Sequence, residues 1–102
     1  MEFIETERLL KIWGERLKRA RIARNDTMKI FGVRIGVSEG TVRDMERGAR
    51  TVQIGTWLNA LVVVNRIEEV EQVLEPKESL IDQARMLAKR KTKLRAYPRK
   101  RG

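Results

Sequence analysis

Residues 27–48 read TMKIFGVRIGVSEGTVRDMERG and hold the clearest structural signal in the chain. Thr27 is of a type that caps helix N-termini, because its side-chain oxygen can accept a free backbone N–H of the first turn. A short helix is therefore predicted over residues 28–34, and the spacing of Phe31 and Ile35 directs both side chains inward.

A second short helix is predicted over residues 39–47, directly after a tight turn at Gly36. Ser38 is suited to cap its first turn, and Gly48 to adopt the left-handed conformation that often ends a helix. Two short helices joined by a glycine turn have the anatomy of a DNA-reading motif.

The second of these helices has one apolar face, formed by Val42 and Met45, that can pack against Phe31 and Ile35. Its remaining side chains are free to enter a DNA major groove. They are Glu39, Gly40, Thr41, Arg43, Asp44 and Arg47.

Helical spacing of apolar residues continues on both sides of this motif. It predicts a helix over residues 6–24 capped by Thr6, a mostly buried helix over 54–64, and a fifth over 66–74 ended by Pro76. The tryptophans lie on these apolar stripes, so we expect them in the core rather than on a base-stacking surface. A further helix start is indicated at residues 79–82, and no convincing strand alternation occurs. The chain is therefore expected to be all-α, a compact five-helix bundle.

Net charge is distributed very unevenly along the 102 residues. The total is +9, yet residues 1–84 carry equal numbers of basic and acidic groups, and residues 85–102 carry nine basic and no acidic groups. We therefore expect two parts, a globular domain over 1–76 and a short helix with a basic tail over 77–102. The tail could bind DNA phosphates, RNA or an acidic partner surface, or serve only as a solvated end.

Composition excludes several functions. With neither cysteine nor histidine, the chain lacks a disulfide, a thiol nucleophile and the commonest metal ligand and general base. We expect no enzyme activity, no cofactor and no metal. The longest apolar run is too short to span a membrane, and the acidic N-terminus is unlike a signal peptide, which predicts a cytoplasmic protein. If the chain binds DNA as the motif predicts, it is also nucleoid-associated.

Residues 13–65 resemble the phage-repressor and Cro type of helix–turn–helix protein, also called the xenobiotic-response-element family. The matching positions are Gly14-Glu15-Arg16-Leu17-Lys18, Arg21, Arg24, Thr27, Phe31-Gly32, Ile35-Gly36-Val37-Ser38, Thr41-Val42 and Met45-Glu46-Arg47-Gly48. The chain departs from the family at Asp26, where leucine is common, and at Met28, where glutamine usually contacts a phosphate. The resemblance implies a partly buried ion pair between Arg21 and Glu46, whereas the residues alone also allow two solvated charges.

Ten residues are candidates for contact with double-stranded DNA. Thr41 can touch a thymine methyl group or a base-edge acceptor, and Arg43 can bind guanine with two hydrogen bonds. Glu39 and Asp44 repel phosphates, so they suit this surface either by accepting from a cytosine amino group or, for Glu39, by stabilising the helix N-terminus. Glu39 and Arg43 also have the spacing of an ordinary surface pair. The full set is Lys29, Ser38, Glu39, Gly40, Thr41, Arg43, Asp44, Arg47, Arg50 and Thr51.

A second apolar stripe has two interpretations. Val63, Ile67, Val70 and Leu74 recur at helical spacing, and they either complete the core or form the seam of a homodimer. We favour the homodimer seam, because the helix–turn–helix proteins that this chain resembles typically bind pseudo-palindromic operators as dimers.

Residues 52–101 resemble HipB-type regulators, which are encoded beside HipA-type kinase toxins. This resemblance rests on residues Val52 to Leu61, which are followed by an acidic segment and a basic tail. The resemblance implies a repressor of its own operon that also binds the toxin. A stand-alone or phage-type regulator, and an interaction adaptor that no longer reads bases, are the alternatives.

Overall fold

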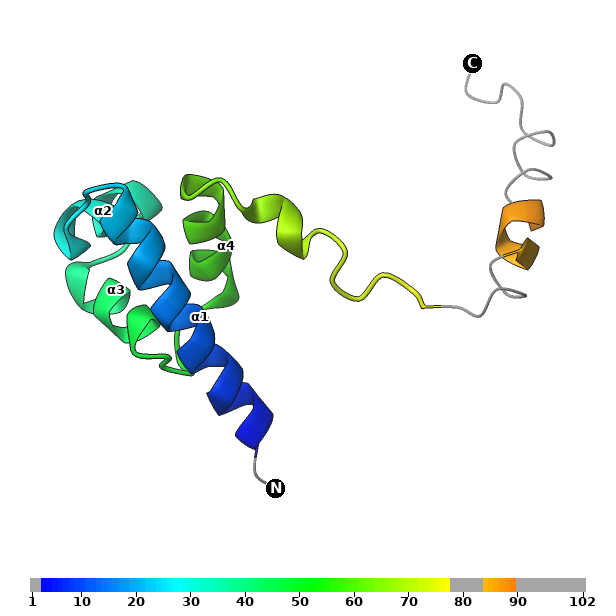
Figure 1. Cartoon of the computed structure of the whole chain (residues 1–102), viewed down its shortest axis with the longest axis horizontal. Coiled ribbons are helices and arrows are strands. Elements are labelled where there is room, and N and C mark those ends of the chain that lie inside the picture. Colours follow the sequence, from blue (N-terminus) through cyan, green and yellow to red (C-terminus); the bar gives the residue numbers. More distant parts are fainter. Residues whose placement is uncertain (1–2, 78–83, 90–102) are drawn as a thin grey trace, which may run out of the picture. The chain divides into compact units, whose positions relative to one another are not determined.

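A computed structural model describes residues 3–77 and 84–89 of the chain (Figure 1). The chain divides into two units, Met1–Glu71 and Gln72–Gly102. Every regular element in the described residues is helical and none is a strand, so the expectation of an all-α protein is confirmed. No helix in these residues is both long and apolar enough to cross a membrane.

The first unit is built from four α-helices and one 3-10 helix, which Figure 1 shows in chain order. The helix α3 packs against both α1 and α2, while α4 packs against α2 and the 3-10 helix η1. The elements are α1 (Ile4–Ala23), α2 (Met28–Ile35), α3 (Glu39–Glu46), α4 (Ile54–Val63) and η1 (Ile67–Val70).

The caps around the central pair of helices form as the sequence predicts. The Thr27 side chain accepts a hydrogen bond from the N–H of Ile30 at 3.1 Å. Gly36 and Gly48 adopt φ angles of 83° and 81°, in the left-handed region that glycine enters without steric cost. These local contacts hold α2 and α3 to eight residues each.

The expected cap of the first helix is wrong. The helix α1 begins at Ile4, and its N-cap residue Phe3 makes no side-chain cap hydrogen bond. Thr6 therefore lies inside the first turn rather than before it. The extra turn places Glu5 and Glu7 near the positive end of the helix dipole, where acidic side chains stabilise a helix without a capping hydroxyl.

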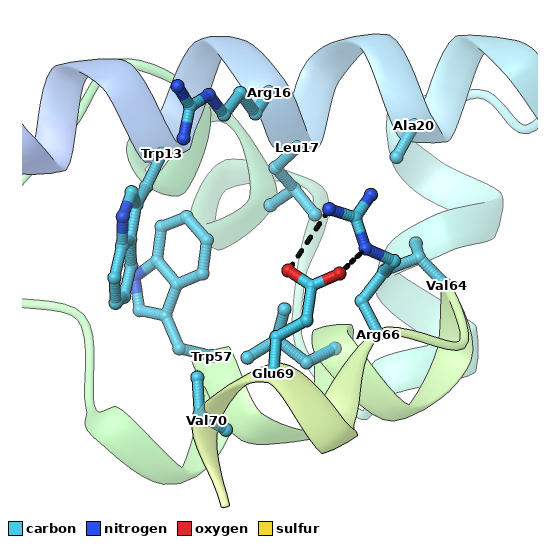
Figure 2. A pocket seen from close by; sticks show the side chains of 10 residues that line it. Trp13, Arg16, Leu17, Ala20, Trp57, Val64, Arg66, Glu69 and Val70 are labelled. Atoms are coloured by element: carbon cyan, nitrogen blue, oxygen red, sulfur yellow. Dashed lines mark hydrogen bonds and ion pairs between the residues drawn. The ribbon is translucent and has the colours of Figure 1, made fainter. Parts of the chain in front are cut away.

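The hydrophobic core lies where all four α-helices meet. Its buried members are Leu17, Phe31, Ile35, Val42, Met45, Trp57 and Ala60. Trp13 packs against this core and meets Trp57 edge to face, with ring centroids 5.7 Å apart. The buried Trp57 Nε1 has no hydrogen-bond acceptor among the described residues. Figure 2 shows the nitrogen-bearing edge of Trp57 beside the Trp13 ring, whose π face is a weak acceptor.

The fifth helix differs from the expectation. Instead of an α-helix over residues 66–74, the chain forms the 3-10 helix Ile67–Val70 followed by turns. Val73 and Leu74 are exposed, so little burial would offset the conformational entropy lost in ordering a nine-residue α-helix. Arg66 and Glu69 bond to each other at a spacing of three, which suits a 3-10 helix because residues i and i+3 eclipse.

The proposed dimer stripe is consequently not the face of one helix. Val63, Ile67 and Val70 are half-buried in α4 and η1, whereas Leu74 is 95% exposed at a φ of 67° in the second unit. In that second unit, residues 84–89 are helical and exposed, in agreement with a further helix. The expected start of that helix at residues 79–82 and most of the basic tail lie outside the described residues.

Candidate nucleic-acid interface

The helix α3 is anchored by one face and presents the other to solvent. Val42 and Met45 are completely buried in the core with Phe31 and Ile35, as the sequence predicts. The residues expected to read DNA are all half-buried or exposed, and none of them belongs to the core. A helix fixed along one side with polar side chains along the other has the geometry needed to enter a groove.

The N-terminus of α3 is held by Ser38. The Ser38 hydroxyl accepts a hydrogen bond from the N–H of Thr41 at 3.2 Å, and the two hydroxyl oxygens also lie 3.2 Å apart. When Ser38 donates to Thr41, the Thr41 hydroxyl hydrogen remains available for an acceptor outside the protein. The methyl group of Thr41 is a second potential contact, with the C5-methyl of thymine.

The two exposed carboxylates of α3, Glu39 and Asp44, pair with neighbouring arginines. Arg43 Nη2 lies 3.5 Å from Glu39 Oε2, and Arg47 Nη2 lies 3.5 Å from Asp44 Oδ1. These side chains are between 47% and 70% exposed, and exposed pairs of this kind contribute about 0–1 kcal/mol. Arg43 or Arg47 can therefore leave its carboxylate partner for a nucleic-acid acceptor with little loss of free energy.

Three further candidate residues flank this surface. Lys29 in α2, and Arg50 and Thr51 after α3, are exposed, and their side chains make no hydrogen bond or ion pair with the described residues. Gly40 is open as well, because the nearest atom to a β-carbon built there is Ser38 Oγ at 3.7 Å. The structure thus pairs Ser38 with Thr41, Glu39 with Arg43 and Asp44 with Arg47, and leaves Lys29 and Arg50 without a bonded partner among the described residues.

A buried ion pair sets the position of α3 relative to α1. Arg21 Nε and Nη2 bond to the two Glu46 carboxylate oxygens at 2.6 and 3.1 Å, and the two side chains are only 10% and 3% exposed. Arg21 Nη1 also donates to the carbonyl of Asp26 at 2.9 Å. These bonds to Glu46 raise the pKa of Arg21 above its ordinary value. The structure confirms the pair and excludes two solvated charges.

The same two helices approach unusually closely at Gly14. A β-carbon built on Gly14 would lie 2.6 Å from the carbonyl oxygens of both Met45 and Glu46. Backbone atoms cannot rotate away as a side chain can, so only glycine fits between α1 and the last turn of α3. Gly14 and the Arg21–Glu46 pair therefore position α3 from its inner side.

Asp26 has a structural role that the sequence analysis did not assign. Its side chain is 7% exposed and bonds to Arg24 Nε at 3.2 Å and to Arg34 Nε at 3.0 Å. Arg24 in turn donates to the carbonyl of Val63 at 3.1 Å, at the C-terminal end of α4. One sequence feature could have indicated this role: Asp26 is the only carboxylate among several basic residues between Arg21 and Arg34, at a position where the family resemblance suggests a leucine.

The described residues contain no group of three or more His, Cys, Asp or Glu side chains placed to hold a metal ion. Comparisons of the chain with protein-family models, curated proteins and solved structures find no match.

Proposed function

We propose that this chain is a sequence-specific DNA-binding repressor that acts as a dimer and reads the major groove with α3. The main support for this proposal is the way α3 packs. Val42 and Met45 lie in the core, whereas Thr41 and Arg43 lie on the outer face. The Ser38 cap and the Arg21–Glu46 pair hold the direction of the helix before DNA is bound. Preorganisation of this kind lowers the entropic cost of binding.

Arg43 is the residue most suited to read a base. Its guanidinium is held only by an exposed pair with Glu39, and it can leave that partner to donate two hydrogen bonds to guanine. Glu39 would then lie near the base edges, where it can accept from the amino group of cytosine. Arg47, Arg50 and Lys29 suit the flanking phosphates, which fix register without reading sequence.

Replacing Arg43 with alanine is expected to weaken specific binding to the DNA upstream of the chain's own gene by about 10- to 100-fold, because one good bidentate base contact contributes about 1–3 kcal/mol. Fluorescence anisotropy at fixed salt measures the effect, with a scrambled duplex for non-specific binding. Arg8→Ala is the matched control, since it removes the same charge from another exposed pair, with Glu5 on α1. Equal binding by wild type, Arg43→Ala and Arg8→Ala would contradict base reading by Arg43.

Replacing Gly40 with alanine separates DNA approach from folding. The substitution meets no close atom and replaces glycine inside a helix, so the free energy of unfolding should rise by up to about 1 kcal/mol. If α3 approaches the groove closely at this point, affinity for the same duplex should nevertheless fall several-fold.

Gly55→Ala is the control for Gly40→Ala. Gly55 occupies the same second position of its helix, α4, and a β-carbon there also meets nothing within 4 Å. We expect Gly55→Ala to raise stability and leave DNA affinity unchanged. An equal affinity for both alanine variants would show that Gly40 is not at the DNA surface.

The toxin-related part of the proposal is supported by the resemblance of residues 52–101 to HipB-type regulators. In this scheme dimers block an operator, and a HipA-type kinase toxin docks on the acidic stretch 66–82 and modulates repression. Within that stretch Glu68, Glu69, Glu71 and Glu75 are all exposed. A kinase-like gene beside this one favours the scheme, whereas a phage gene cluster favours a stand-alone regulator.

The pairing of carboxylates with arginines on α3 favours a second candidate function. A face on which Arg43 and Arg47 are each neutralised by a neighbour also suits an interaction adaptor that contacts a protein partner. Recovery of a partner together with the absence of any DNA footprint would favour the adaptor over the repressor.

A further inference from the structure

A cavity of about 200 Å³ lies among α1, α4 and η1, on residues that the proposed DNA surface does not use (Figure 2). Its wall is apolar and comes from three separate elements. The main contributors are Leu17 from α1, Trp57, Leu61 and Val64 in and after α4, and Val70 from η1. Apolar cavities of about 150 Å³ can take up a benzene ring, so this one is large enough for a single aromatic ring.

The rim of the cavity is charged. Arg66 and Glu69 bond to each other there through two hydrogen bonds, of which the Nη2–Oε1 bond is 3.0 Å long. The Arg66 bond lowers the pKa of Glu69, and the Glu69 bond raises the pKa of Arg66, so both groups are charged at neutral pH.

Arg16 also lines the cavity, and its side chain has no hydrogen-bond or ion-pair partner among the described residues. It is near enough to Glu69 to contribute to the lowered pKa of that carboxyl. The three rim charges therefore sum to one positive charge, and one cation is left without a bonded anion.

We propose that this cavity binds a small aromatic carboxylate, with its ring against Trp57 and the aliphatic wall and its carboxylate on Arg16. The ring would cover apolar wall atoms of a cavity that is open to solvent, and the anion would match the single excess charge of the rim. A neutral aromatic compound would satisfy only the first of these conditions.

The ligand also has a route to regulation, which rests on the proposed function. A ring packed on Val70 would favour the ordered form of η1, a four-residue 3-10 helix with no buried residue. Val63, Ile67 and Val70 are three of the four residues predicted for the dimer seam, and the structure leaves them half-buried. Binding would thus alter the dimer, and through it the spacing of the two DNA-reading helices.

Tryptophan fluorescence tests the binding step without DNA, because both tryptophans of the chain line the cavity. The probe is 3-phenylpropionate, and 3-phenylpropan-1-ol is its neutral counterpart. We expect a saturable fluorescence change with the acid, at a Kd on the order of 1 mM for so small a ligand. The alcohol should bind about tenfold more weakly, because it lacks the charge-assisted contact.

Two substitutions on α1 locate the carboxylate. Arg16→Gln should weaken binding of the acid about tenfold and leave binding of the alcohol unchanged. Arg19→Gln, at an exposed arginine of the same helix paired with Glu15 at 4.0 Å, should change neither. Circular dichroism verifies that both variants keep the helical content of the wild type.

Several results would overturn the proposal. These are the absence of a saturable change, equal affinity for the acid and the alcohol, and an Arg16→Gln variant that binds the acid as the wild type does. Loss of binding as protein concentration rises would show that a second copy covers the cavity instead. None of these outcomes depends on DNA, so a failure here is distinct from a failure of the repressor proposal.

Discussion

Replacing Glu46 with alanine is expected to lower the free energy of unfolding by about 3–5 kcal/mol. The variant leaves Arg21 buried without its carboxylate, and removing one partner of a buried pair is far more costly than the pair is stabilising. Arg21 would keep only its bond to the Asp26 carbonyl.

Urea denaturation followed by circular dichroism measures this loss. Glu5→Ala is the control, because Glu5 also bonds an arginine, Arg8, but both side chains are exposed, and the expected change is below about 1 kcal/mol. Replacing both members, as in Arg21→Met with Glu46→Leu, should recover much of the stability because no unpaired charge stays buried. If Glu46→Ala were as mild as Glu5→Ala, the pair would not be what fixes α3.

Replacing Gly14 with alanine is expected to destabilise the protein by about 2–3 kcal/mol net. In an open helix the same change would stabilise by about 1 kcal/mol, because alanine is the better helix former. Here the added methyl group would lie 2.6 Å from two carbonyl oxygens of α3, and the two helices must separate to admit it. The sign of the effect therefore reports the close approach directly.

Thermal and urea unfolding of Gly14→Ala should be compared with Gly55→Ala, which adds the same methyl group at an open helical position. The two variants should change stability in opposite directions. Because α3 would be displaced, Gly14→Ala should also reduce specific DNA affinity under conditions where it is still folded. A neutral or stabilising Gly14→Ala would exclude tight packing of α1 on the end of α3.

The residues at the ends of α2 and α3 show which structural features can be predicted from neighbouring residues alone. Thr27 and Ser38 cap the helices that follow them, Gly36 forms the expected tight turn, and Gly48 takes the expected left-handed conformation. Each of these features depends on atoms within about three residues of one another. For that reason they could be predicted from spacing alone.

The candidate site was predicted in part. That α3 buries Val42 and Met45 and exposes its polar residues follows from helical periodicity. The Arg21–Glu46 pair joins residues 25 apart, and only the family resemblance suggested it. The pairing of Glu39 with Arg43 was open between base reading and a surface pair, and the free protein shows the surface pair.

The sequence by itself determined the helical class, the ends of α2 and α3, and which face of α3 is apolar, because these depend on neighbouring residues. Three features were decided by tertiary structure alone. They are the 3-10 helix and turns that replace the expected α-helix over residues 66–74, the burial of Asp26, and the need for glycine at position 14. A short segment gains most of its helical stability from another element that buries its apolar face, and a charge is buried only when distant partners surround it. Such conditions are set by packing between helices.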